Sequence, residues 1–258
     1  MNDFNRAYSP SVNAGSMDTS VNAGLRAFML GVYQKLALGI ALAGALAFVV
    51  GTNMVPALTE LVLFSPFRLV VQFGPIALIL ISAFAMRRPS PLGTAILYWT
   101  IVTLLGLSLS VWFFMASMNV EGASRAGITF GPTFITIAKA FFLTASAFGA
   151  LSLWGYTTKR DLQPLGIIAI FALWGIVGIS LLSFLFPPSG MLETAITVGV
   201  LAISGFLVAF DTQNLKQGYF AYEGDARSLA VMTNWGALNF FILFYNIFTT
   251  LMSLLSRD

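Results

Sequence analysis

The residues able to do chemistry in this sequence are few, and most of them interrupt apolar stretches. Asp211 follows an apolar run from Ala195 to Phe210 that is broken only by Thr197 and Ser204. A helix of that length rises about 24 Å, less than a hydrocarbon core of about 30 Å, so the helix is expected to continue past Asp211. From length alone, Asp211 fits an interfacial residue and a carboxylate acting inside the membrane equally well.

Two arginines end another apolar stretch on the same side as Asp211. Arg88 is interpreted as an anchor on the positively charged side of the membrane, whereas Arg87 lies one residue deeper, at the depth of Asp211. An ion pair between Asp211 and Arg87 would lower the cost of holding either charge away from water, provided that their helices are neighbours.

Neutral polar residues and one lysine interrupt two further stretches. Asn239 and Asn246 lie seven residues apart in the last one, so they share a helix face. They are either ordinary hydrogen-bonding residues between helices or a polar strip along a pathway. Lys139, about six residues inside its own stretch, is expected to extend its side chain toward the outer headgroups.

The composition explains why these isolated residues matter. The chain has 258 residues, of which 58% are hydrophobic and 9% charged, and its mean hydropathy is +0.87. Soluble domains carry roughly 25% charged residues. We therefore predict an all-α integral membrane protein, a bundle of seven transmembrane helices at residues 30–52, 69–86, 94–117, 133–156, 164–186, 192–211 and 229–254.

The ends of the chain and its charges predict a topology. Residues 1–27 are rich in Ser, Asn and Gly and are predicted to be a disordered cytoplasmic tail, followed by the transmembrane domain at 28–258. The bias of Lys and Arg places the amino terminus in the cytoplasm and the carboxyl terminus outside. The inner side carries Arg6, Arg26, Lys35, Arg87, Arg88, Lys159, Arg160, Lys216 and Arg227, and the outer side carries Arg68, Arg125 and Arg257.

Several function classes are disfavoured by what the sequence contains. The net charge of +3 is too small and too scattered for nucleic-acid binding. Without cysteine or histidine there are no thiolate or imidazole metal ligands. An intramembrane aspartyl protease needs two carboxylates, a serine protease needs a base, and no phosphate-binding loop occurs. We predict a non-enzyme without a cofactor, surrounded by the lipid bilayer.

Four stretches from about residue 26 to the end resemble the transmembrane Bax-inhibitor-motif proteins of the Bax inhibitor one type, in their bacterial branch. They are "FMLGVYQKLALGIALAG", "AFFLTASAFGALSLWGYTTKRDL" (140–162), "FDTQNLKQGY" (210–219) and "ALNFFILFYNIF" (237–248), and the second is the most specific. The resemblance implies a seven-helix bundle with the last helix at its centre. It also implies a calcium or proton leak channel, a cell-death suppressor or, in bacteria, a partner of a membrane-bound ATP-dependent protease.

The resemblance also implies roles for particular residues. In this family the Asp of the "DTQ" motif pairs with an Asp of the last helix, and an Arg at the inner end of the second helix competes for it. The first Asp and the Arg correspond to Asp211 and Arg87, but Leu243 replaces the second Asp, while Asn246 matches the Asn that follows. A lone carboxylate cannot share a proton as a dyad does. Because calcium prefers six to eight oxygen ligands, Asp211 is expected to be only a weak calcium site.

Two functions follow as predictions. The first is a cation leak channel for calcium or protons, gated around Asp211 and Arg87, with Asn239 and Asn246 along its path. The alternative is a non-conducting regulatory binding protein that acts on a membrane-bound ATP-dependent protease or on a stress or cell-death response. A transporter of small solutes has no substrate-specific feature to support it. The expected location is the bacterial inner membrane.

Overall fold

The computed structural model describes residues 14–85, 89–126, 133–182 and 190–256, and no strand occurs in that part of the chain. In chain order the elements are α1 (Ala14–Gly51), α2 (Pro56–Thr59), the π-helical turn η1 (Glu60–Phe64), α3 (Phe67–Ala85), α4 (Pro91–Ala126), α5 (Phe134–Thr157), α6 (Gln163–Leu182), α7 (Gly190–Ala221) and α8 (Ala226–Leu255). Each predicted stretch overlaps one long helix. The prediction of an all-helical membrane protein is confirmed.

The predicted count of seven crossings is not confirmed. Five helices are long and apolar enough to cross a membrane, namely Ala23–Gly51, Pro91–Asn119, Phe134–Thr157, Gly190–Ala221 and Ala226–Leu255. A sixth crossing would be the pair Pro56–Phe64 and Phe67–Ser82, whose two parts are bent by 65°. In α6, the apolar helix Gln163–Ile176 is shorter than a full crossing. The described part of the chain therefore has five to six candidate crossings.

The bend arises between the first and second predicted stretches, where the sequence predicts only a connection. Pro56 starts α2 at the first helical position, which tolerates proline. The hydroxyl of Thr59 donates to the carbonyl oxygen of Val50 at 2.7 Å and holds α2 against the end of α1. Ser65 then adopts an extended backbone (φ −89°, ψ 167°), which ends η1 and redirects the chain into α3. Local backbone geometry, rather than hydropathy, divides this helical segment.

The first helix begins earlier than the predicted boundary between tail and membrane domain. Residues 14–27 belong to α1, whereas residues 1–13 of the predicted tail lie outside the described ranges. Leu25 is only 2% exposed, and the ring centroid of Phe28 lies 5.6 Å from that of Tyr219 on α7. Packing against α7 stabilises this part of α1, and the polar composition of the segment does not reveal such a tertiary contact.

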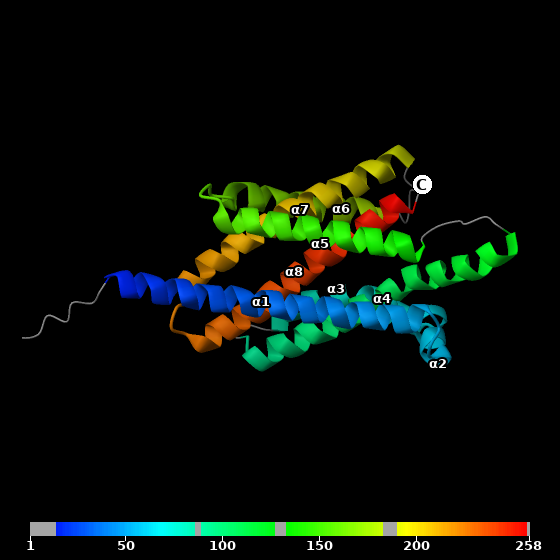
Figure 1. The fold of residues 1–258 in the computed structure, drawn as a ribbon, viewed down its shortest axis with the longest axis horizontal. Coiled ribbons are helices and arrows are strands. Elements are labelled where there is room, and N and C mark those ends of the chain that lie inside the picture. Colours follow the sequence, from blue (N-terminus) through cyan, green and yellow to red (C-terminus); the bar gives the residue numbers. More distant parts are fainter. Residues whose placement is uncertain (1–13, 86–88, 127–132, 183–189, 257–258) are drawn as a thin grey trace, which may run out of the picture.

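The last helix lies at the centre of the bundle, as the resemblance implied. Figure 1 shows α8 crossing obliquely between α1, α3 and α4 on one side and α5, α6 and α7 on the other. Among these helices α8 packs directly on α1, α4, α5 and α7, while α3 packs on α4 and α6 packs on α7. Small residues allow close approach of helices, as at Gly106, where a Cβ would lie 2.6 Å from Cα of Ala43.

Asp225 caps the amino terminus of α8 outside the membrane-spanning segments. Its carboxylate accepts hydrogen bonds from the backbone N–H groups of Arg227 at 3.0 Å and Ser228 at 3.2 Å, and from the Ser228 hydroxyl at 2.5 Å. The preceding Gly224 has a φ of 87°, a conformation that glycine adopts most readily. The hydrogen bonds from Ser228, and then from Arg227, hold the pKa of Asp225 below its ordinary value of 3.8.

This cap predicts a pH-dependent stability difference. Because the folded pKa of Asp225 is lowered, the carboxylate stabilises the fold fully above pH 3.8, and this stabilisation is lost as the pH falls through the folded pKa. Asp225→Ala should therefore lower the thermal unfolding temperature in detergent at neutral pH, with a smaller effect in acid. Asp225→Asn keeps a capping side chain and should unfold close to wild type. An equal loss for Asp225→Ala at every pH would contradict the assignment.

Candidate functional site in the membrane

Asp211 lies inside a helix rather than at the end of one. The α7 helix continues past Asp211 to Ala221, which confirms the expected extension. The side chain is half-buried. Within the described ranges, the Asp211 carboxylate forms no hydrogen bond or ion pair. The predicted partner Arg87 falls in residues 86–88, outside the described ranges, so the Asp211–Arg87 pair stays a prediction.

The packing of α7 on α8 defines which residues share a depth. A Cβ added at Gly218 would lie 2.8 Å from Met232 Sδ, and one added at Gly236 would lie 2.7 Å from Leu215 Cδ2. The two helices are consecutive and antiparallel, so equal steps from these contacts reach equal depths. Asp211 is seven residues before Gly218 on α7, and Asn239 is seven residues after Met232 on α8. The two residues therefore lie at the same depth.

The same register puts a second pair of polar residues at one depth, about two helical turns deeper. Ser204 is seven residues before Asp211 and shares its helix face, and it reaches the level of Asn246 on α8. Ser204 is fully buried, and its Oγ is the one buried side-chain polar atom in the described part of the chain without a hydrogen-bond partner. Ser204 was not predicted as a site residue, although it is one of the two polar breaks in the apolar run before Asp211.

The two asparagines differ in their surroundings. Asn239 is exposed, whereas Asn246 is half-buried and lines a cavity of about 720 Å³ between α3, α4, α6 and α7. Arg68, Gln72 and Ser108 also line this cavity. The structure thus places one asparagine at the depth of Asp211 and the other at this cavity, and within the described ranges no hydrogen bond joins either to Asp211.

Leu243 lies between these two levels. It is buried, at 5% exposure, and the register sets it opposite Leu207, about one helical turn from Asp211. Across the described residues, no group of three carboxylates, histidines or cysteines could hold a metal ion. The chemistry available here is that of one carboxylate with neutral oxygen and amide groups near its depth.

Other residues of the "DTQNLKQGY" motif have structural partners. Gln213 accepts a hydrogen bond from the Leu162 N–H at 2.9 Å and donates to the Arg160 carbonyl oxygen at 2.8 Å. Asn214 accepts from the Gln163 amide at 2.9 Å. The motif therefore holds the connection between α5 and α6, which belongs to the second resembling stretch.

Two further motif residues bind α5 itself. The Thr212 hydroxyl lies 3.0 Å from the Ser152 hydroxyl, which also hydrogen-bonds with Tyr33 of α1. Lys216 donates to the Tyr156 carbonyl oxygen at 3.1 Å, and its Nζ lies 4.9 Å from the centroid of the Tyr156 ring. Thr212, Gln213, Asn214 and Lys216 therefore all have hydrogen-bond partners on or beside α5. The Asp211 carboxylate has none in the described ranges.

A second polar cluster joins α1, α4 and α8 and was not predicted. Lys35 Nζ donates to the Asn234 side-chain oxygen, and the Asn234 amide donates to Thr94 Oγ1 and to the Pro91 carbonyl oxygen, both at 2.9 Å. Asn234 is 2% exposed. From the sequence, Lys35 was placed among the basic residues of the inner side. Its position inside an apolar stretch is the sequence feature that could have indicated a buried hydrogen-bond partner. Lys139, in contrast, is exposed on α5.

This cluster predicts a measurable coupling. Asn234→Leu should lower the free energy of unfolding in detergent by about 2 kcal/mol, because Lys35 loses its acceptor and two oxygens lose a donor. Lys35→Met in the Asn234→Leu background should recover part of that loss, since it removes the unpaired charge. Chemical unfolding followed by fluorescence measures both effects. Simple addition of the two single-variant losses would contradict the coupling.

The fold and this site define a class of protein: an integral membrane bundle of helices with the Asp211 carboxylate partway along one of them. The chain belongs to the Bax inhibitor family, because the sequence model described as "Inhibitor of apoptosis-promoting Bax1" matches residues 25–258.

Relatives match the chain over nearly its whole length. An uncharacterized protein of Caulobacter vibrioides is 43% identical over 98% of this chain and 97% of its own length. Inner membrane protein YbhL of Escherichia coli K12 is 31% identical over 89% of this chain and 91% of its own. A membrane protein of Streptococcus pyogenes serotype M3 is 28% identical over 93% of this chain and 96% of its own length.

Proposed function

We propose that the protein is a leak channel for calcium or protons whose path follows α7 and α8. The path passes Asp211 and Asn239, then Ser204 and Asn246, and opens through the cavity between α3, α4, α6 and α7. Arg87, at the sequence depth of Asp211, competes with the cation for the carboxylate and closes the path.

The observation that carries the proposal is the position of Asp211 inside α7 without a hydrogen-bond or ion-pair partner in the described ranges. An ionised residue at membrane depth costs about 2.5–3.5 kcal/mol on insertion scales, and such residues mark ion and proton pathways. A passing cation would supply the missing partner. The buried and unpartnered Ser204 Oγ supports a second ligand farther along the same helix face.

Further features belong to the same proposal. The family resemblance favours seven crossings, with α6 and the bent pair α2–α3 completing the bundle, and with the amino terminus in the cytoplasm. The Escherichia coli relative is named as an inner membrane protein, and we extend this location to the present chain. The protein is proposed to act without enzymatic chemistry and without a bound cofactor, with Asp211 as a weak and transient calcium ligand.

Purified protein in calcium-loaded liposomes tests the function. Calcium release should exceed that of protein-free liposomes by severalfold, and a pH-sensitive dye should report proton leak in parallel vesicles. Release equal to that of empty liposomes, at both neutral and acidic pH and for both ions, would exclude conduction.

One observation favours the alternative of a regulatory binding protein. The α1 helix has 38 residues, about 57 Å at the usual rise, whereas a hydrocarbon core of about 30 Å needs some 20 residues. The start of α1 therefore extends beyond the bilayer and offers a contact for a membrane-bound ATP-dependent protease. Deleting residues 2–24 spares the buried Leu25. The truncated protein should then lose a co-purifying protease that the full chain retains; equal recovery would exclude this contact.

A further inference from the structure

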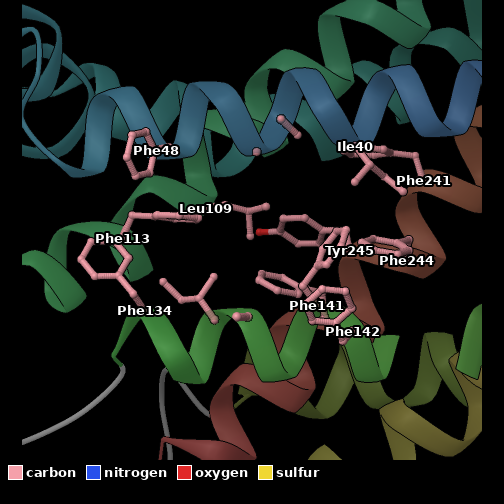
Figure 2. Close-up of a pocket in the computed structure, with 15 residues that line it drawn as sticks. Ile40, Phe48, Leu109, Phe113, Phe134, Phe141, Phe142, Phe241, Phe244 and Tyr245 are labelled. Atoms are coloured by element: carbon pink, nitrogen blue, oxygen red, sulfur yellow. The ribbon is translucent and has the colours of Figure 1, made fainter. Parts of the chain in front are cut away.

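Two further cavities lie on the opposite flank of α8 from the proposed ion path. Two cavities, of about 340 Å³ and about 590 Å³, follow one another between α1 and α5. Both are lined by Ile40 and by Phe244, so they adjoin there, and we call the two together the α1–α5 groove. Figure 2 shows the smaller cavity, with Phe48 and Ile40 above it on α1, and Phe134 and Phe141 below it on α5.

The wall of the α1–α5 groove is apolar along most of its length. In the smaller cavity the polar side chain is Tyr245, whose hydroxyl binds the Ser108 hydroxyl at 2.9 Å. Two glycines in the wall face empty space: a Cβ at Gly44 or at Gly149 would meet no atom within 4 Å. An apolar channel of this kind neither stabilises an ion nor holds water, so it does not serve the path past Asp211.

One end of the groove is polar and basic. Arg26, Tyr156 and the Tyr33–Ser152 hydrogen bond line the larger cavity. Lys216 adds a second positive charge at this end, since its Nζ lies 4.9 Å from the centroid of the Tyr156 ring. Aromatic and basic residues together at one depth are typical of the membrane interface, where they contact lipid headgroups.

We propose that the α1–α5 groove binds one acyl chain of an anionic phospholipid, whose phosphate is held by Arg26. From Arg26 to Ile40, α1 rises about 21 Å, and half of the hydrocarbon core is about 15 Å thick. A chain from the leaflet on the Arg26 side therefore fills the larger cavity and brings its end toward Phe244, where the aromatic cavity begins. The groove opens between two membrane-spanning helices, so lipid enters it from the bilayer, and the basic end selects an anionic headgroup.

The test uses the full chain in mild detergent and native mass spectrometry, with phosphatidylglycerol or phosphatidylcholine added at equal concentrations. Wild type should retain one phosphatidylglycerol, with weaker retention of phosphatidylcholine. Arg26→Gln should lower phosphatidylglycerol affinity about fivefold, the effect of one basic residue near a membrane surface. Gly149→Leu fills the larger cavity, and because each methylene of a chain contributes about 0.8 kcal/mol, it should lower retention of both lipids at least tenfold. Gly44→Leu fills only the aromatic cavity beyond the end of the chain and should have a smaller effect.

Matched variants separate binding from folding. Gly175 on α6 also faces open space but lines neither cavity, and Arg160 is an exposed arginine of the α5–α6 connection outside the groove. Gly175→Leu and Arg160→Gln should retain phosphatidylglycerol as wild type does. Wild-type retention in Gly149→Leu would overturn the site, and equal loss in Arg160→Gln and Arg26→Gln would overturn the headgroup assignment. The proposal does not rest on conduction, so calcium flux can fail while lipid retention holds.

Discussion

Asp211→Asn should reduce cation flux through the reconstituted protein at least tenfold while leaving the fold intact. Asparagine has nearly the same shape as aspartate but carries no charge. A unit charge acting on a cation at about 4 Å contributes roughly 4 kcal/mol at an effective dielectric constant of 20, and each 1.4 kcal/mol changes a rate about tenfold. The Asp211 side chain has no hydrogen-bond partner to lose in the described part of the chain, so unfolding should begin at nearly the wild-type temperature. Calcium efflux from liposomes measures the rate.

Two companion variants sharpen this test. Asp225→Asn removes a carboxylate of the same type outside the membrane-spanning segments, so it should leave flux unchanged. Ser204→Ala removes the buried hydroxyl on the face of Asp211 and should lower flux by a smaller factor without affecting stability, because that hydroxyl has no partner. Flux in Asp211→Asn equal to wild type would show that the carboxylate is not on the path, and equal losses in both Asp variants would indicate a general charge effect.

Gly155→Ala should lower the free energy of unfolding by about 3 kcal/mol, near the upper end of overpacking costs. At Gly155 the helices α5 and α7 approach so closely that a Cβ would lie 2.2 Å from the Ala209 carbonyl oxygen and 2.7 Å from its Cα. These are backbone atoms, so no side-chain rotation relieves the clash, and α5 must move away from α7. Chemical unfolding in detergent measures the loss.

The matched control lies on the same helix. At Gly149 a Cβ would meet no atom within 4 Å, so Gly149→Ala should be neutral or slightly stabilising through its higher helix propensity. Gly155 lies two residues before Thr157, the end of α5. A displacement of α5 at Gly155 should therefore also strain the hydrogen bonds of Gln213 with residues 160–162 and lower the cation flux. A Gly155→Ala protein as stable as wild type would contradict this prediction, because it would show that α5 and α7 can separate at Gly155 at little cost in free energy.

The sequence alone was sufficient for several features. Hydropathy is a local property of the chain, so run length located the helices, and the short run before Asp211 correctly implied that α7 continues beyond it. The sequence did not predict the ends of the helices as well. The packing of α1 before its apolar stretch depends on Leu25 and Phe28, and the bend before α3 depends on the backbone of Ser65. The average hydropathy of a stretch predicts neither of these features.

Pairings between helices were decided by the tertiary structure. Sequence spacing placed Asn239 and Asn246 on one face of α8. Only the close approach of Gly218 to Met232 and of Gly236 to Leu215, between α7 and α8, set their depths against Asp211 and Ser204. Likewise, Lys35 and Asn234 lie far apart in the chain, and their hydrogen bond follows from the packing of α1 on α8. The sequence determined that this is a helical membrane protein of the Bax inhibitor type with one carboxylate in an apolar run. Helix packing, which depends on contacts between distant segments, decided what lies around that carboxylate.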